Sequence, residues 1–550
     1  MFVLGLLLVK FVYTNASPTI KLGETTLVGR DIPSLGQEFF GGIPFAEPPL
    51  GNLRLRPPVP KTSIGYSTLN ATDYGPACLQ TANGIAPDQV SEDCLTINVL
   101  RPSGTPANAK LPVMFWTFGG GFVGGLSSQF NASAIVAQSV TRGTPVIYVN
   151  FNYRLGPLGF ALGQEAGEKG ALNLGIKDQL AALEWVKANI ETFGGDKSKV
   201  TVFGESAGAI MTSILFLNLS LNNLARAAIL ESGSQATSAL FTSERGELDW
   251  QNFVAAVPSC AFTVTSGSTF DCLRRANTTE IFTGLSVVTT PPSAGLTAPD
   301  EPLPWGPVLD GPGGVIPDLP SVLFSRGSFA RLPFIAGTNK DEGTVFTPPA
   351  INSTEEIIDG LVALFNPTAS PTTELEQSIQ TLLQLYPDIP ALGSPFDTSN
   401  NTFGLNSQYK RAAAGVGDLN FQSQRRLWME TAANAGVKTF GYLFTQPQPL
   451  LPAAFGVPHS SEIRYVYGAP TDTSASSVLI SRLMIEYWVS FTTSLTPNDG
   501  QGIPRPEWAQ FTPQNKTLIQ LNGANVTMIP DDFRAEQMDF INSNPTIWRH

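Results

Sequence analysis

The sequence predicts an α/β fold built on a mostly parallel sheet, because strand-like and helix-like segments alternate through the middle of the chain. Leu111–Phe118 is a continuous apolar run that ends at three glycines, and Ile176–Ile190 carries apolar residues at helical spacing before a Phe-Gly-Gly stop. Strands that are buried on both faces are apolar along their whole length. The alternation therefore indicates a parallel sheet with helices packed on it.

Further segments extend this alternation toward the C-terminus. Short strands are predicted at 145–150, 199–203, 227–231, 333–336, 439–444 and 517–521, and helices at 207–217 and 478–493. The stretches 240–330 and 350–430 are less regular, and we expect them to form helical and loop insertions around the functional site. By size alone, 550 residues would allow about three or four domains.

Charge and hydropathy exclude several classes of function. The formal net charge is -12 and no Lys/Arg-rich run occurs, so the basic surface that nucleic acid requires is absent. The apolar start, Met1–Val9, is too short for a membrane span, which needs about 20 residues. It resembles a secretory signal peptide over residues 1–16, cleaved after Ala16, the alternative being a disordered or strand-forming start. No transmembrane segment is expected.

Sequons and cysteines also favour an extracellular, secreted protein. Beyond the predicted signal peptide, eight asparagines begin an N-x-S/T sequon: Asn70, Asn131, Asn218, Asn277, Asn352, Asn400, Asn515 and Asn525. The four cysteines allow three pairings, and their grouping favours Cys78–Cys94 and Cys260–Cys272 over free thiols in a reducing compartment. Neither pair is C-x-x-C, so no zinc or redox site is expected, and no motif predicts a cofactor.

The pentapeptide Gly204–Gly208, Gly-Glu-Ser-Ala-Gly, predicts a nucleophile. G-x-S-x-G is typical of a sharp strand-to-helix turn that exposes a serine. Here the motif follows the predicted strand 199–203 and precedes a helical run of small residues, as such a turn requires. Ser206 is therefore the candidate nucleophile, and the alternative is a glycine-rich turn with a bystander serine.

A serine nucleophile needs a base, which is normally histidine, and this chain has only two histidines. His550 is the last residue, and we expect it to be mobile. His459 follows Gly456 and Pro458, which indicate a loop of the kind that often carries catalytic residues. The shortage of histidine makes His459 the expected base.

Two other groups complete this chemistry. The run Gly119–Gly121 follows a predicted strand upstream of the serine, where its N–H groups could hold an oxyanion. A flexible loop is the alternative, and a phosphate cradle is disfavoured because no G-K-[ST] follows. The chain order Ser, acid, His confines the acid to 207–458. Asp341 and Glu342 lie in a turn after a predicted strand, and both are candidates on physical grounds.

Together these residues resemble the type B carboxylesterase/lipase family, which includes the cholinesterases and secreted fungal lipases. Similar blocks span nearly the whole chain: FGGIPFAEPP from Phe40, SEDCLTIN from Ser91, FNYR from Phe151, FGGD from Phe193, NKDEG from Asn339 and GVPH from Gly456. The resemblance implies the α/β-hydrolase fold, with a large, mostly parallel central sheet flanked by helices and helical insertions around the active site. It also implies one elaborated catalytic domain over 17–550 instead of several.

The resemblance further implies roles for individual residues. These are Ser206 as nucleophile, Glu342 instead of Asp341 as acid, His459 as base, Gly120, Gly121 and Ala207 as oxyanion donors, and Ser232 beside the acid. It implies the two disulfides named above and a buried Arg54–Glu92 ion pair. The expected activity is hydrolysis of small-molecule carboxylic esters through an acyl-enzyme. A lipase or sterol esterase with the same triad is the alternative, and a non-catalytic adhesion homologue is disfavoured because all three positions are filled.

The chain departs from the family pattern in the first disulfide loop, Leu79–Asp93. Lipases and cholinesterases carry a longer loop, so the sequence predicts a short flap and little activation by lipid interfaces. The loop has no aromatic residue to hold a quaternary ammonium, so choline esters are not expected as preferred substrates. Trp116, Phe122 and Phe346 lie beside the motifs, where they either line the pocket or, as we favour, belong to the core. No sequence feature specifies an oligomeric state.

Overall fold

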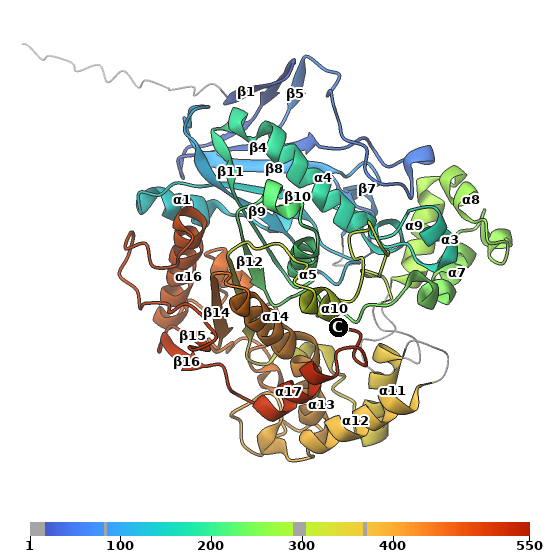
Figure 1. Cartoon of the computed structure of the whole chain (residues 1–550). Helices are drawn as coiled ribbons and strands as arrows, with labels where there is room; N and C mark the ends of the chain where they lie inside the picture. The colour runs from blue at the N-terminus through green and yellow to red at the C-terminus, as the bar shows by residue number, and fades with distance from the viewer. Residues whose placement is uncertain (1–16, 82–84, 290–303, 367–370) are drawn as a thin grey trace, which may run out of the picture.

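An 11-stranded sheet forms the centre of the protein in a computed structural model that describes residues 17–81, 85–289, 304–366 and 371–550 (Figure 1). The predicted signal peptide, residues 1–16, lies outside the described residues. The order across the sheet is β16-β15-β14-β13-β12-β11-β9-β10-β8-β4-β3. The strands are β3 Arg30–Ile32, β4 Gln37–Pro44, β8 Thr96–Pro102, β9 Leu111–Thr117, β10 Ile147–Phe151, β11 Gly195–Glu205, β12 Ala227–Glu231, β13 Phe334–Asn339, β14 Thr439–Phe444, β15 Thr517–Leu521 and β16 Thr527–Pro530.

The central strands of this sheet are parallel. Every neighbouring pair from β10 through β9, β11, β12, β13 and β14 to β15 is parallel, whereas β8, β4, β3 and β16 join antiparallel at the two edges. The central strands β10, β12, β13 and β14 are buried at every residue. This arrangement confirms the predicted α/β class with a mostly parallel sheet.

Helices pack on the sheet and form two further groups. Contacts to the sheet come from α4 and α5 at β11, from α16 at β9 and β11, and from α14 at β13 and β14. Figure 1 shows α3, α7, α8 and α9 gathered at one end, and α11, α12 and α13 at another. The longer helices are α1 Ser133–Thr141, α4 Leu174–Asn189, α5 Ala207–Ile214, α7 Glu247–Ala256, α9 Thr278–Val288, α11 Thr354–Phe365, α12 Thr373–Leu385, α13 Ser407–Gly417, α14 Ser423–Asn434, α16 Ala475–Ser494 and α17 Ala535–Ser543.

The two outer groups have their own buried clusters, one around Trp250 and Phe253 and one around Ile379 and Tyr409. Of these groups, α7, α8 and α9 fall within 240–330, and α11, α12 and α13 within 350–430, where the sequence predicts insertions. The remaining helices are short: α2 Gly156–Gly159, α3 Gly163–Glu168, α6 Leu221–Leu224, α8 Phe270–Arg275, α10 Pro320–Ser325 and α15 Ile463–Val466. Five small strands lie outside the main sheet: β1 Thr19–Leu22, β2 Thr25–Val28, β5 Thr68–Asn70, β6 Ala77–Cys78 and β7 Val90–Ser91.

Two disulfides and a buried ion pair hold the segments near the flap. Cys78 is bonded to Cys94, and Cys260 to Cys272. The Arg54 guanidinium contacts both carboxylate oxygens of Glu92 at 2.6 Å. It also donates to the main-chain oxygens of Leu273 and Ala276, in the segment that carries the second disulfide. Arg54 thus ties the base of the flap to the α8 region.

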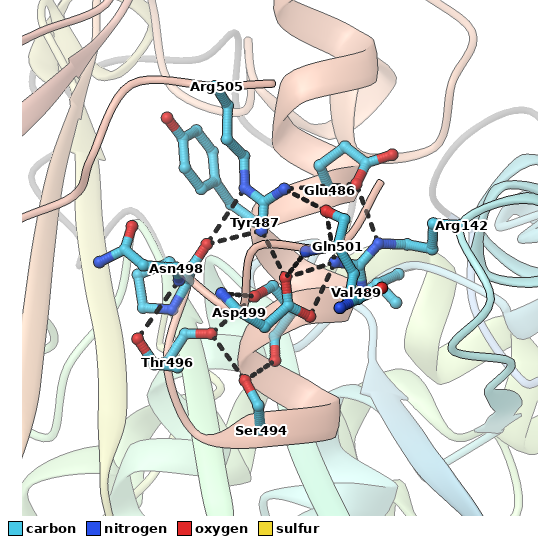
Figure 2. A network of polar contacts seen from close by, with 12 residues as sticks. Arg142, Glu486, Tyr487, Val489, Ser494, Thr496, Asn498, Asp499, Gln501 and Arg505 are labelled. Atoms are coloured by element: carbon cyan, nitrogen blue, oxygen red, sulfur yellow. Dashed lines mark hydrogen bonds and ion pairs between the residues drawn. The ribbon is translucent and has the colours of Figure 1, made fainter. Parts of the chain in front are cut away.

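A second buried charge network joins α1, α16 and the loop that follows α16 (Figure 2). Arg142 donates from Nε to Glu486 at 2.9 Å and from one terminal nitrogen to both oxygens of Asp499 at 2.8 Å. Arg505 contacts Asp499 at 2.8 Å from the other side. All four side chains are at most 8% exposed. Two buried carboxylates therefore share two buried guanidinium groups, and removal of either arginine leaves both carboxylates on a single cation.

Replacing Arg142 by alanine is expected to lower the free energy of unfolding by about 3–5 kcal/mol, because Glu486 and Asp499 would keep buried charge without this partner. Denaturant unfolding measures the change. The matched control is Arg326→Ala, which breaks the exposed pair with Asp318 and should cost at most about 1 kcal/mol. Equal, small losses in both variants would contradict a structural role for the network.

Candidate active site

Ser206 occupies the turn between β11 and α5, and its backbone has the strained conformation φ 53°, ψ -128°. A non-glycine residue at positive φ costs on the order of 1–3 kcal/mol and persists only where the surroundings enforce it. Glycine permits the close packing that enforces it here, because a Cβ on Gly208 would lie 2.0 Å from the Thr117 carbonyl oxygen. The start of α5 therefore packs directly on the end of β9, and the half-buried Ser206 lies at the tip of the turn.

The glycine loop after β9 lies beside this turn. A Cβ on Gly119 would be 2.9 Å from the Ser206 Cβ. Gly120 and Gly121 have φ values of 110° and 61°, a region that favours glycine. Within the described part of the chain, the main-chain N–H groups of Gly120, Gly121 and Ala207 donate to no protein acceptor. Unpaired donors thus occur on both sides of Ser206.

Glu342, and not Asp341, contacts the imidazole of His459. Glu342 follows β13, is buried, and lies 2.6 Å through Oε2 from His459 Nδ1. Its other oxygen accepts from the Ser232 hydroxyl and from the Asn339 N–H, both at 2.6 Å. These contacts hold the carboxylate in one orientation and place Ser232 directly against it.

The second imidazole nitrogen of His459, Nε2, is buried. It lies 3.3 Å from Glu205 Oε1, and among the described residues it makes no hydrogen bond. Glu205 immediately precedes Ser206, and it accepts a hydrogen bond from the Ser460 hydroxyl. The imidazole is therefore fixed at Nδ1 and unpartnered at Nε2, beside the turn that carries Ser206.

Buried carboxylates raise the pKa of His459. Burial of the imidazole lowers the pKa, but the charges of Glu205 and Glu342 outweigh this effect and raise it to about 9. The ordinary value for histidine is about 6.5, and without these neighbours burial would hold the pKa of His459 below that value. Since a histidine base must be neutral to accept a proton, this shift moves the working range toward higher pH.

The value of kcat/KM is expected to rise with pH, with a midpoint above 6.5. In Glu205→Gln a negative neighbour is removed, so the pKa of His459 falls and the midpoint should move to lower pH. Glu168→Gln, a change on the exposed surface, is the matched control and should leave the midpoint in place. A pH–rate profile measures all three proteins. A wild-type midpoint at or below 6.5, or no movement in Glu205→Gln, would show this electrostatic account to be wrong.

A further carboxyl group, Glu462, lies behind the acid. It accepts from the Asn339 side-chain amide at 2.6 Å and lies 3.2 Å from the Ser232 hydroxyl. Burial, together with the charges of Glu205 and Glu342, raises the pKa of Glu462 to about 8. Ser232 has one hydroxyl proton, which the 2.6 Å contact commits to Glu342. A protonated Glu462 that donates to Ser232 is therefore the form that fits.

The sequence does not identify Glu205, Asn339 and Glu462 as neighbours of the predicted triad. All three lie within or near the motifs: Glu205 inside the pentapeptide, Asn339 at the start of NKDEG, and Glu462 three residues after His459. Proximity to a motif was the available signal. The motif alone could not tell which of its polar residues point inward.

Two phenylalanine rings flank the His459 imidazole. The ring of Phe346 lies 5.0 Å and that of Phe421 4.8 Å from it, centroid to centroid. Phe421 belongs to a π-helical turn, Asp418–Gln422, between α13 and α14. Trp116 lies in the core against Phe203, as favoured from the sequence. Phe346 is instead half-buried beside the site.

The flap is attached to the glycine loop at its base. The Gln80 side chain, two residues after Cys78, donates to the Gly125 carbonyl oxygen and accepts from the Gly125 N–H, both at 2.8 Å. The neighbouring Thr81 hydroxyl contacts that of Thr289 at 2.8 Å. Residues 82–84 of the predicted flap lie outside the described residues.

The expectation that His550 is mobile is wrong. Its side chain is buried, and Nδ1 lies 2.6 Å from the Gln424 side-chain nitrogen. The Ser321 hydroxyl donates to its main-chain oxygen, and Figure 1 places the C-terminus beside α10. Burial lowers the pKa of His550 to about 3, so this imidazole stays neutral. The last residues pack into the protein, with Trp548 also buried, and this packing holds His550 in place.

Over the ranges that the structure covers, no helix combines the length and apolarity needed to cross a bilayer. The same ranges contain no group of three or more histidine, cysteine, aspartate or glutamate side chains that could hold a metal ion.

The fold and the serine turn define an enzyme of the α/β-hydrolase class, and comparison with known proteins specifies the class further. The carboxylesterase family pattern matches residues 16–541, so the chain belongs to the carboxylesterase family, whose members are serine hydrolases. It is 33% identical to "Lipase 2" of Geotrichum candidum over 533 residues, 90% of each chain. It is 34% identical to "Secreted lipase 1" of Botryotinia fuckeliana over 575 residues, 96% of this chain and 93% of the relative. The crystal structure of Aspergillus niger EstA superposes with a TM-score of 0.83 at 27% identity, over 97% of this chain and 99% of that one.

Proposed function

We propose that the protein is a secreted hydrolase of small-molecule carboxylic esters that acts through Ser206, His459 and Glu342. The observation that carries this proposal is the 2.6 Å contact between Glu342 and His459 Nδ1, combined with an Nε2 beside the serine turn that makes no hydrogen bond among the described residues. A carboxylate on one imidazole nitrogen fixes the tautomer in which the other nitrogen can accept a proton.

The proposed reaction has two halves. His459 Nε2 takes the proton of the Ser206 hydroxyl while the Ser206 oxygen bonds to the ester carbonyl carbon. The tetrahedral intermediate collapses, and the alcohol leaves with the proton from Nε2, so that an acyl-enzyme remains. A water molecule then gives a proton to His459 and attacks the acyl carbon. The bond to Ser206 breaks, Ser206 regains its proton, and the carboxylic acid is released.

The oxyanion of both intermediates would be held by the N–H groups of Gly120, Gly121 and Ala207. These N–H groups have no acceptor in the part of the protein that the structure describes, which supports this role, since donors that are already paired could not serve it. The positive φ values of the two glycines orient the loop without a side chain in the way. Loss of one such donor costs about 100- to 1000-fold in rate.

A lipase or sterol esterase with the same triad is the second candidate, and the names of the relatives favour it, since both relatives named above are called lipases. The short Cys78–Cys94 flap, whose base Gln80 anchors to Gly125, favours soluble esters. A panel of short-chain, long-chain, aromatic-acid and sterol esters separates the two.

Rates measured across the solubility limit of one ester test the flap directly. Because the flap is short, we expect the rate to follow the dissolved concentration and to level off at saturation. A soluble ester of similar acyl chain serves as the control for inhibition by excess substrate. A large jump in rate when an emulsion forms would contradict the expectation and favour the lipase.

Secretion is supported by the two disulfides, by relatives named as secreted lipases, and by the sequons. Seven of the eight sequon asparagines are exposed and Asn218 is half-buried, so an N-glycan would be accommodated at most of them. A fall in mass of the protein from culture medium after deglycosylation tests this; protein that stays inside the cell would contradict it.

A further inference from the structure

The neighbour of the acid, Asp341, has a buried carboxylate that the proposed chemistry does not use. Its side chain is 2% exposed, and three donors converge on it. Oδ1 accepts from the Ser394 hydroxyl at 3.0 Å and from the Phe396 N–H at 2.8 Å, and Oδ2 accepts from the Val457 N–H at 2.9 Å. Since every partner is a donor, the ionised carboxylate is the form that suits this site.

The contact with Val457 is reciprocal. The Asp341 N–H donates to the Val457 carbonyl oxygen at 3.0 Å, while the Val457 N–H donates to the Asp341 carboxylate. Val457 lies two residues before His459, and Asp341 lies one residue before Glu342. A single residue therefore joins the loop that carries the proposed base to the turn that carries the proposed acid.

Gly456 makes this approach possible. Its backbone has φ 62° and ψ -120°, and a Cβ on it would lie 2.4 Å from Asp341 Oδ2 and 2.6 Å from Pro395 Cβ. The missing side chain leaves the space that the carboxylate occupies. The segment 394–396, the turn at 341–342 and the loop at 456–459 therefore meet at one carboxylate.

We propose that Asp341 is a positioning residue, whose side chain holds the histidine loop Gly456–Ser460 at the separation from Glu342 that the His459 contact requires. The inference rests on the proposed function, because it assigns a role in presenting the base of that triad. Asp341 touches neither the imidazole nor the serine in the contacts described, so its effect on the reaction is exerted through Val457.

The test is Asp341→Asn, which keeps the shape of the side chain but turns one acceptor oxygen into a donor. A shift of about 1 Å in a catalytic group can cost about 100-fold in rate, so kcat should fall about 10- to 100-fold while KM stays within about three-fold. Titration with a fluorophosphonate gives the active fraction, so kcat is expressed per competent site. The matched control, Asp397→Asn, removes the same charge from a side chain that is 84% exposed and should leave kcat unchanged.

A spectroscopic signature separates positioning from stability. With only two histidines in the chain, the low-field proton resonance of His459 Nδ1–H is assigned by its persistence in His550→Gln. It should shift or broaden in Asp341→Asn and stay in place in Asp397→Asn. A variant that melts earlier but keeps kcat and this resonance would overturn the proposal and leave Asp341 a structural residue.

Two further comparisons make the outcome decisive. Should Asp341→Asn fail to fold, Ser394→Ala removes one of the three donors and is expected to lower kcat about three-fold; an unchanged kcat would then contradict positioning. Turnover that survives in Ser206→Ala would instead overturn the proposed function itself. If Asp341→Asn keeps the wild-type kcat while Ser206→Ala is inactive, only the role proposed for Asp341 is overturned.

Discussion

Replacing Ser206 by alanine is expected to lower kcat for a soluble ester by on the order of 10⁶-fold, the loss that follows removal of a triad serine. The substitution deletes the oxygen that would form the acyl-enzyme, while the strained turn around it is enforced by the contacts of Gly204 and Gly208. KM should change little, because the N–H groups proposed to hold the oxyanion remain. Initial rates with a chromogenic ester measure the effect.

Ser213→Ala is the matched control. Ser213 lies on the same helix, α5, is buried, and donates only to the Ile210 carbonyl oxygen. It should keep kcat within about two-fold, as expected for a site outside the chemistry. Substantial turnover in purified Ser206→Ala would mean that another group attacks the ester.

Replacing Glu342 by glutamine should lower kcat about 10⁴-fold, as removal of the charge does in related triads. The amide keeps the size of the side chain but can place its NH₂ group against His459 Nδ1, which favours the wrong tautomer. It also removes a negative charge that raises the pKa of His459, so the midpoint of the pH profile should fall. Both quantities come from one set of pH–rate measurements.

The control for Glu342→Gln is Glu355→Gln, the same change on the exposed start of α11, which should alter neither kcat nor the midpoint. If Glu342→Gln kept more than about a tenth of the wild-type kcat, the imidazole would not depend on this carboxylate. In that event Glu205, which lies 3.3 Å from His459 Nε2, would become the alternative candidate for the acid.

The centre of the fold could be predicted from the sequence because its strands are buried on both faces. The predicted strands 227–231, 439–444 and 517–521 have the bounds of β12, β14 and β15. The antiparallel edge strands β3 and β16 are only partly buried and carry no continuous apolar run, so they were missed. The insertions were expected in place, but their helices, and the π-helical turn that presents Phe421, depend on contacts between distant segments.

The site shows the same division between local and distant information. Ser206 and His459 could be named from a motif and from the scarcity of histidine, since both signals are local. The raised pKa of His459 depends on Glu205, 254 residues away, and the role inferred for Asp341 depends on Val457 and segment 394–396. The burial of His550 was not predicted, because a terminal position says nothing about the packing of α17 and Trp548.

Covalent labelling with a fluorophosphonate, followed by peptide mass analysis, tests the central claim most directly. If Ser206 is a nucleophile activated by His459 and Glu342, one equivalent should add to the peptide that contains Ser206, turnover should disappear in proportion, and Glu342→Gln should label far more slowly. No adduct, or an adduct on another residue with loss of turnover, would contradict the account.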